Sequence, residues 1–259
     1  LTDWWRLSVA VDVQMNKMNA DLQDFSYPKR WTELASMASS VDFEKVSVQA
    51  SLLGTFIQES TRSRKLYTAS PDKRELSPVV FFSYTPMSES DFVITGFFKR
   101  IFRMPTFNDL YYTEIGNANL KPERTWQYDL GVAYGLQLGG GFLKSLKFRA
   151  DGYYNTVTDK IIAYPTGQQF RWTMLNLGKV RIGGVESALV LDAAVRKVAV
   201  GLNLQYTFQK AYDCTDKEDS FYGDQIPYTP LHSGSVACRF DWNGWQLNYS
   251  FIYTGERYN

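Results

Sequence analysis

The sequence predicts an all-β fold, specifically a segment of an antiparallel transmembrane β-barrel with about ten long strands. Three observations lead to this prediction. Apolar and polar residues alternate over most of the 259 residues, which is typical of strands with two unlike faces. The longest alternating segments exceed the ~5–6 residues that are usual in globular sheets. Aromatic residues make up 16% of the chain, and they gather at the ends of the apolar faces, as they do in membrane barrels.

Residues 198–209 show the alternation clearly. Leu202 and Leu204 fall on one face of the expected strand, whereas Asn203 and Gln205 fall on the other. About 9–11 tilted residues are enough to cross a bilayer, and the longer segments exceed that length. Ten strands are expected on this pattern: 5–14, 43–58, 77–86, 91–102, 123–137, 144–162, 170–191, 196–210, 228–240 and 245–256.

The placement of aromatic residues favours a membrane barrel over a soluble sandwich, whose strands would also alternate. Trp126 and Tyr134 lie near the two ends of one apolar face, and Trp245 and Tyr253 do so on another strand. The mean hydropathy is only −0.30, although aromatic residues are abundant. This combination is typical of amphipathic rings placed at interfaces.

The connections between expected strands alternate between short and long. Tight turns are expected at 139–141, 193–194 and 241–244, whereas the polar connections at 103–122 and 211–227 are long. Outer-membrane barrels have this asymmetry, with turns on the periplasmic side and long loops outside.

Residues 15–42 interrupt the alternation. A short helix is expected over 31–38, with Thr32 as its N-cap. On this prediction a long connection would lie at the end of the barrel that otherwise carries the short turns.

The charge balance excludes an electrostatic nucleic-acid interface. The chain has 28 basic and 27 acidic residues, a net charge of +1, so no nucleic-acid partner is expected. The basic runs at 62–65 and 99–100 are short and are interpreted as solvated charge. No segment reaches the ~18 consecutive apolar residues that a spanning helix needs.

Residue types that often act in catalysis or metal binding are scarce. Cys214 and Cys238 make neither a disulfide framework nor a metal site. His232 is the only histidine, and catalysis needs a nucleophile, a base and an orienting group together. The sequence therefore predicts a protein that is not an enzyme and that has no cofactor, metal or catalytic residue.

Residues 102–123 contain the most specific pattern in the chain. Pro105 fixes its own φ and ends ladder pairing, so the chain is expected to leave the sheet there. Asn108 and Asp109 favour turns because their side chains bond to nearby backbone. Pro122 is expected to begin the next strand. We interpret the segment chiefly as a rigid loop base that holds two strands in register, rather than as a direct ligand contact.

This segment resembles a signature of the TonB-dependent outer-membrane receptors, in which F-R-x-P-T-x-N-(D/E)-L-Y precedes G-N-x-x-L-x-P-E. Residues 176–186 and 226–232 resemble two weaker signatures of the family, in the family's order. The residues of the family-motif loop are Arg103, Pro105, Thr106, Phe107, Asn108, Asp109, Leu110, Tyr111, Gly116, Asn117, Leu120, Pro122 and Glu123.

The resemblance implies a bacterial outer-membrane receptor that imports a large scarce nutrient, such as a ferric siderophore, haem or cobalamin. Its partners would be outer-membrane lipid, a small-molecule or metal-chelate ligand, and the TonB–ExbB–ExbD complex, reached through an N-terminal region that this sequence lacks. Residues 1–259 are expected to be part of a barrel of the 22-stranded type, without its plug domain and terminal strands. The alternative is a soluble or surface β-rich binding module without transport.

In the receptor interpretation, the polar face would line the barrel interior and the long loops would meet the ligand. Lys147, Arg149, Asp151, Asn203 and Gln205 are the interior residues singled out by the alternation. Aromatic side chains can grip large ligands, so the possible ligand contacts are Tyr111, Tyr112, Phe170, Trp172, Tyr212, Phe221 and Tyr222.

Overall fold

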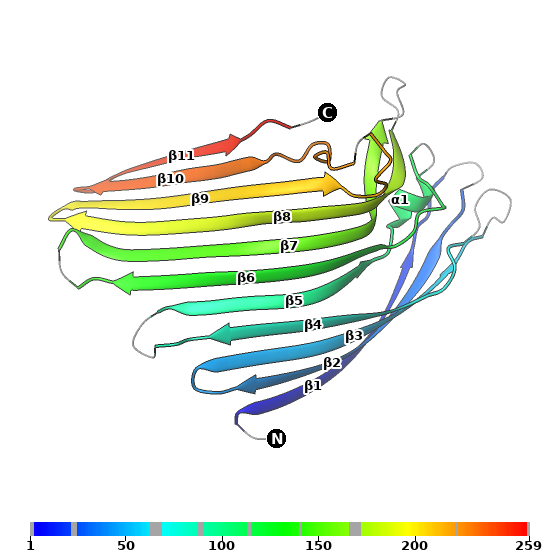
Figure 1. The fold of residues 1–259 in the computed structure, drawn as a ribbon, viewed down its shortest axis with the longest axis horizontal. Coiled ribbons are helices and arrows are strands. Elements are labelled where there is room, and N and C mark those ends of the chain that lie inside the picture. Colours follow the sequence, from blue (N-terminus) through cyan, green and yellow to red (C-terminus); the bar gives the residue numbers. More distant parts are fainter. Residues whose placement is uncertain are drawn as a thin grey trace.

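One curved antiparallel sheet makes up almost the whole protein (Figure 1). The computed structural model describes residues 3–21, 25–62, 69–87, 91–112, 115–139, 141–165, 172–220 and 222–257. Its eleven strands follow one another in sequence order, each bonded to the strands before and after it. The sheet does not close, because β1 and β11 each have one neighbour among the described strands.

The strands are long, as the alternation predicts. They are β1 (Trp5–Lys17), β2 (Lys29–Asp42), β3 (Val46–Ser60), β4 (Lys73–Tyr84), β5 (Val93–Arg103), β6 (Glu123–Gln137), β7 (Leu143–Pro165), β8 (Trp172–Val195), β9 (Val198–Asp213), β10 (His232–Trp242) and β11 (Trp245–Thr254). The single helix among the described residues is α1 (Phe107–Tyr111). All ten expected strands are present, with ends that differ by at most four residues.

The helix expected over 31–38 is wrong, because this segment lies within strand β2. The run from Ala35 to Ser40 is rich in alanine and serine, so its two faces differ little in polarity. Glu33 also lies on the face that is apolar in the neighbouring strands, opposite Val13 of β1 and Phe56 of β3. Pairing with β1 and β3 along its whole length forms the strand, since tertiary context overrides weak local propensity.

With β2 in place, the connections separate by length at the two ends of the sheet (Figure 1). The long-loop end carries the connections between β1 and β2, β3 and β4, β5 and β6, and β9 and β10. The short-turn end carries the connections after β2, β6, β8 and β10. The turn expected at 193–194 lies instead at Arg196 and Lys197, where Arg196 has a φ of 54°.

Most strands other than β2 have an apolar face and a polar face. On the apolar face, Val11 of β1 is 73% exposed and Leu130 of β6 is 59% exposed. Aromatic residues border this face at both ends, as Trp126 and Tyr134 do on β6. These two residues are eight positions apart, or about 27 Å along the strand, which at the roughly 40° tilt of barrel strands spans about 20 Å of the apolar band. In the described part of the chain, no helix is long and apolar enough to cross a membrane.

Candidate functional site

The family-motif loop leaves the sheet after β5 and immediately forms the short helix α1. Thr106 is the N-cap, and its hydroxyl accepts a hydrogen bond from the Asp109 amide at 3.1 Å. The Asp109 carboxylate in turn accepts from the Thr106 amide at 2.8 Å. This reciprocal capping box satisfies two amides that the first turn would otherwise leave unpaired. Arg103 lies 3.5 Å from the carboxylates of both Asp109 and Glu123, so it ties the start of the loop to its end.

A buried polar network fixes α1 to strands β2 and β3. Glu59 of β3 accepts hydrogen bonds from Arg30 Nε at 2.8 Å and from the hydroxyl of Tyr111. Arg30 also donates to the carbonyl oxygen of Pro105 at 2.8 Å, and its guanidinium lies 4.8 Å from the ring centre of Phe107. The side chains of Arg30 and Glu59 are only 12% and 1% exposed. Burial and the bond to Glu59 raise the pKa of the Tyr111 hydroxyl well above its ordinary value, so the phenol stays protonated as a donor.

A hydrophobic cluster joins the same loop to the opposite part of the sheet. Leu110 and Tyr111 of α1 pack with Leu120, near the end of the loop, and with Ile161 of β7. Each is almost fully buried. Phe107, Ala118 and Met174 pack around them. The loop therefore connects β2 and β3 on one side with β7 and β8 on the other, and its conformation depends on all four strands.

Hydrogen bonds between side chains and backbone hold the second half of the loop against β8. Asn117 donates its side-chain amide to the Met174 carbonyl at 3.0 Å and caps the Asn119 amide at 3.0 Å. Asn176 accepts from the Lys121 amide at 2.8 Å and donates to the Lys121 carbonyl at 3.0 Å. The first weaker family signature, at 176–186, thus begins with a residue that holds the main signature in place.

Gly116 is required by the tight turn in this loop. A Cβ added there would lie 2.6 and 2.7 Å from the amide nitrogen and carbonyl oxygen of Tyr112. Gly116 also donates its amide to that carbonyl at 2.7 Å, so the two segments cannot separate without losing a bond.

We expect Gly116→Ala to lower the free energy of unfolding by about 1–3 kcal/mol, the usual cost of forcing an extra carbon into a packed site. Urea titration followed by tryptophan fluorescence would measure the change. Gly139→Ala is the control, because an added Cβ there meets nothing within 4 Å. Equal stability of the two variants would show that the loop relaxes freely around position 116.

The residues expected to contact a ligand fall into different environments. Tyr111 is 2% exposed and its hydroxyl is hydrogen-bonded to Glu59, so its side chain packs inside the loop. Tyr212 lies on the apolar face, in register with Arg181. Tyr112, Trp172 and Tyr222 are exposed at the long-loop end. Phe170 and Phe221 lie outside the described residues.

A polar hollow of about 760 Å³, not anticipated from the sequence, lies beside the family-motif loop. It opens between residues 69–73 on one side and 116–121 on the other, with Thr173 of β8 at its edge. Lys73 and Lys121 contribute cationic side chains, and Asn119 contributes an amide. The hollow can therefore donate hydrogen bonds to a ligand and attract its negative charge. Predicting it would have required knowing that the loop folds back toward β4.

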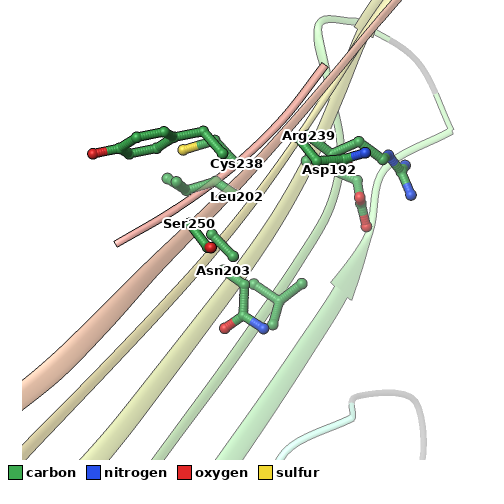
Figure 2. A pocket seen from close by; sticks show the side chains of 11 residues that line it. Asp192, Leu202, Asn203, Cys238, Arg239 and Ser250 are labelled. Carbon is green, nitrogen blue, oxygen red and sulfur yellow. The ribbon is translucent and has the colours of Figure 1, made fainter. Parts of the chain in front are cut away.

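The interior residues expected on the polar face do lie on one face of the sheet. Arg149 donates to Asp151 at 2.7 and 3.0 Å, while Lys147 lies on the same face two residues away. A second hollow of about 320 Å³ lies across β8 to β11. Figure 2 shows Asp192 and Arg239 extending from one side of these strands, with Cys238 on the opposite side. Its residues come from both faces, so it is a surface depression rather than an enclosed site.

Comparison with known proteins gives one family. Residues 36–259 match the family model "TonB dependent receptor-like, beta-barrel". The vitamin B12 transporter BtuB of Photobacterium profundum is 30% identical over 165 residues, which are 61% of this chain and 24% of that protein. The BtuB of Vibrio vulnificus is 33% identical over 94 residues, 36% of this chain and 14% of that protein.

Solved structures share the fold. The copper transporter OprC has a TM-score of 0.73 at 18% identity, covering 98% of this chain and 41% of OprC. The FrpB iron transporter of Neisseria meningitidis has a TM-score of 0.64 at 11% identity, covering 98% of this chain and 42% of FrpB. The chain thus spans about two fifths of these structures and a quarter or less of the curated relatives it matches.

Proposed function

The chain belongs to the TonB-dependent receptors, of whose β-barrel it forms a part, and from this premise we propose that it serves the TonB-driven uptake of a large scarce nutrient across the bacterial outer membrane. The family-level function is nutrient transport rather than catalysis. The observation that carries the proposal for this chain is the family-motif loop, held rigidly at the long-loop end beside a polar hollow.

The proposed orientation follows from the two ends of the sheet. The long-loop end would face the exterior and the short-turn end the periplasm, as in other outer-membrane barrels. The edges of β1 and β11 would pair with further strands to complete a barrel of the 22-stranded type, since unpaired edges are not tolerated in lipid. The polar face, including Arg149 and Asp151, would then surround a plug domain, through which the TonB–ExbB–ExbD complex would act.

The alternative of a soluble binding module is disfavoured by the apolar face. Val11, Leu130 and Leu247 are each more than half exposed, and they lie on strands across the whole width of the sheet. An exposed apolar surface of this extent needs lipid or a protein partner to cover it.

The proposed ligand is a small molecule or metal chelate that carries anionic or hydrogen-bonding groups. Lys73, Asn119 and Lys121 line the hollow, and Tyr112 and Trp172 are exposed at the same end of the sheet. The relatives named above carry vitamin B12, copper or iron in their names. We therefore propose cobalamin, a ferric siderophore, haem or a similar nutrient as the substrate class.

The test is uptake by the full-length protein in cells that lack their own receptors. Labelled cobalamin, ferric siderophores and haem would be supplied one at a time, with and without functional TonB. We expect accumulation of one of them only when TonB is present. Lack of accumulation of any nutrient, or accumulation that does not depend on TonB, would contradict the proposal.

The double variant Lys73→Gln/Lys121→Gln tests whether the polar hollow beside the family-motif loop binds the ligand. We expect about fivefold weaker binding of the transported ligand, from roughly 0.5 kcal/mol for each partly exposed charge. Lys45→Gln/Lys144→Gln removes the same charge at the short-turn end and should leave affinity unchanged. Equal affinities would place ligand recognition elsewhere among the loops.

A further inference from the structure

Tyr111 contacts both walls of the polar hollow although it does not line the hollow itself. One wall is formed by residues 69–73 and the other by residues 116–121. The backbone amide of Ser70, in the first wall, donates a hydrogen bond to the Tyr111 hydroxyl. Leu120, in the second wall, packs in the same buried cluster as Tyr111. Because Tyr111 is only 2% exposed, it connects the two walls from inside the protein.

The Tyr111 hydroxyl holds both ends of the connection between β3 and β4. It donates to Glu59, the next-to-last residue of β3, and it accepts from Ser70, three residues before β4 begins. The Glu59 side chain is 1% exposed and also pairs with Arg30, so the acceptor is itself fixed in place. A single hydroxyl therefore ties the start and the end of this connection to α1.

The second wall is held from a different direction. Asn117 donates to the Met174 carbonyl at 3.0 Å, and Asn176 accepts from the Lys121 amide at 2.8 Å. These bonds attach the wall to β8 and do not involve Tyr111. Loss of the Tyr111 hydroxyl would therefore release the first wall and leave the second where it is.

The two cationic residues of the hollow lie close in sequence to these contacts. Lys73 follows Ser70 by three residues, and Lys121 comes directly after Leu120. The separation of the two walls thus determines how far apart the two ammonium groups lie. An anionic ligand that meets both needs a particular separation, and fixing it before binding reduces the entropy that is lost on binding.

We propose that Tyr111 is the positioning residue of the polar hollow. It sets the separation of the two walls, and thereby the affinity for an anionic ligand that meets Lys73 and Lys121 together. Tyr111 does not touch this ligand. The inference rests on the proposed uptake function, and it names the residue on which the geometry of that binding site depends.

The first measurement is the separation of the two walls in the full-length receptor, by pulsed electron paramagnetic resonance. Spin labels are attached at Asp72→Cys and Asn119→Cys, two exposed positions on opposite walls. The native thiols are removed by Cys214→Ser and Cys238→Ser. We expect Tyr111→Phe, which keeps the ring, to shift the mean distance between the labels by about 2 Å or more, the size of a loop rearrangement.

Tyr153→Phe is the matched control. It removes a hydroxyl that donates to Gln209 at 2.9 Å, between β7 and β9, and neither residue lines the polar hollow. The two variants therefore make the same chemical change and each loses a side-chain hydrogen bond. The distance between the labels should stay that of the wild type in Tyr153→Phe.

A second variant breaks the contact from the other side. Ser70→Pro removes the amide that bonds to Tyr111, because proline has no backbone N–H. Ser70 already precedes Pro71, so its backbone is restricted to the extended conformations that proline also adopts. We expect a shift in the same direction as in Tyr111→Phe. The double variant should shift no further than Tyr111→Phe alone, since both changes remove one contact.

Ligand affinity is the second measurement. Cobalamin, ferric citrate and haem are each titrated onto the purified full-length receptor. We expect Tyr111→Phe to raise the Kd of the nutrient that binds by about tenfold, as for the loss of a hydrogen bond that pre-organises a site. The amount bound at saturation should equal that of the wild type, because a residue that only stabilised the fold would change the number of sites and not their affinity.

An unchanged distance between the labels in Tyr111→Phe would overturn the inference. A changed distance with an unchanged Kd would also overturn it, because the separation of the walls would then not affect recognition. TonB-dependent uptake by the wild type is scored separately. Uptake of a nutrient with unmoved walls refutes this inference alone. Moved walls without binding or uptake of any of the three nutrients contradict the proposed uptake, while the control of the wall separation by Tyr111 stands on the distances.

Discussion

Replacing Glu59 with alanine is expected to lower the free energy of unfolding by about 3–5 kcal/mol, the usual cost of removing one partner of a buried ion pair. The carboxylate is 1% exposed and its partner Arg30 is 12% exposed. Without Glu59, the Arg30 guanidinium stays buried without a carboxylate partner, and the Tyr111 hydroxyl loses its bond to Glu59. Both losses occur where the family-motif loop meets β2 and β3.

The measurement is urea unfolding of the full-length receptor in lipid vesicles, followed by tryptophan fluorescence. Asp241→Ala is the matched control, because it removes the acid from a pair whose side chains, Arg239 and Asp241, are both well exposed. Such surface pairs contribute about 0–1 kcal/mol. If both variants lost the same small amount, the Arg30–Glu59 pair would be no more than a surface contact, and the loop would be held by the hydrophobic cluster alone.

This network could not have been predicted from the sequence, although most of the sheet could. Arg30 and Glu59 are 29 residues apart, and Glu59 is 52 residues from Tyr111. Their contact depends on the register between β2 and β3, where Arg30 pairs directly with Glu59. The weak alternation of 31–38 predicted a helix in the place of β2, so the register could not be inferred.

The alternation of apolar and polar residues predicts a strand correctly where one face is clearly apolar and the other clearly polar. In β9, Leu202 and Leu204 alternate with Asn203 and Gln205, and a single pattern predicts both the strand and its faces. The same pattern, continued to Tyr212, would have placed this residue on the apolar face rather than among the ligand contacts. That signal was available in the sequence.

The conformation of the family-motif loop is a different problem. Its turn residues Pro105 and Gly116 are recognisable, because their backbone requirements are local. Whether Tyr111 points into the loop or out of it is decided by packing against Leu120 and Ile161, which are distant in sequence. An aromatic residue in a loop therefore indicates a contact, but the sequence does not identify whether that contact is a ligand or the protein itself.

The two faces of the sheet lead to the second large prediction. Leu204→Arg is expected to destabilise the receptor in a bilayer by about 2–4 kcal/mol, the cost of a cation at mid-membrane on a barrel's lipid face. Leu204 pairs with Leu189 and Val236 on the apolar face. It lies near the middle of β9, two residues from Tyr206.

Gln205→Arg provides the control, since it adds the same charge one residue away on the polar face. Folding into lipid vesicles, measured by protection from protease, should be impaired by Leu204→Arg and nearly unchanged by Gln205→Arg. The comparison depends on the direction of the side chain and not on the charge itself, because the positions are adjacent and the substituted residue is identical. Equal impairment would mean that both faces meet the same medium, and the proposed bilayer location could not then be maintained.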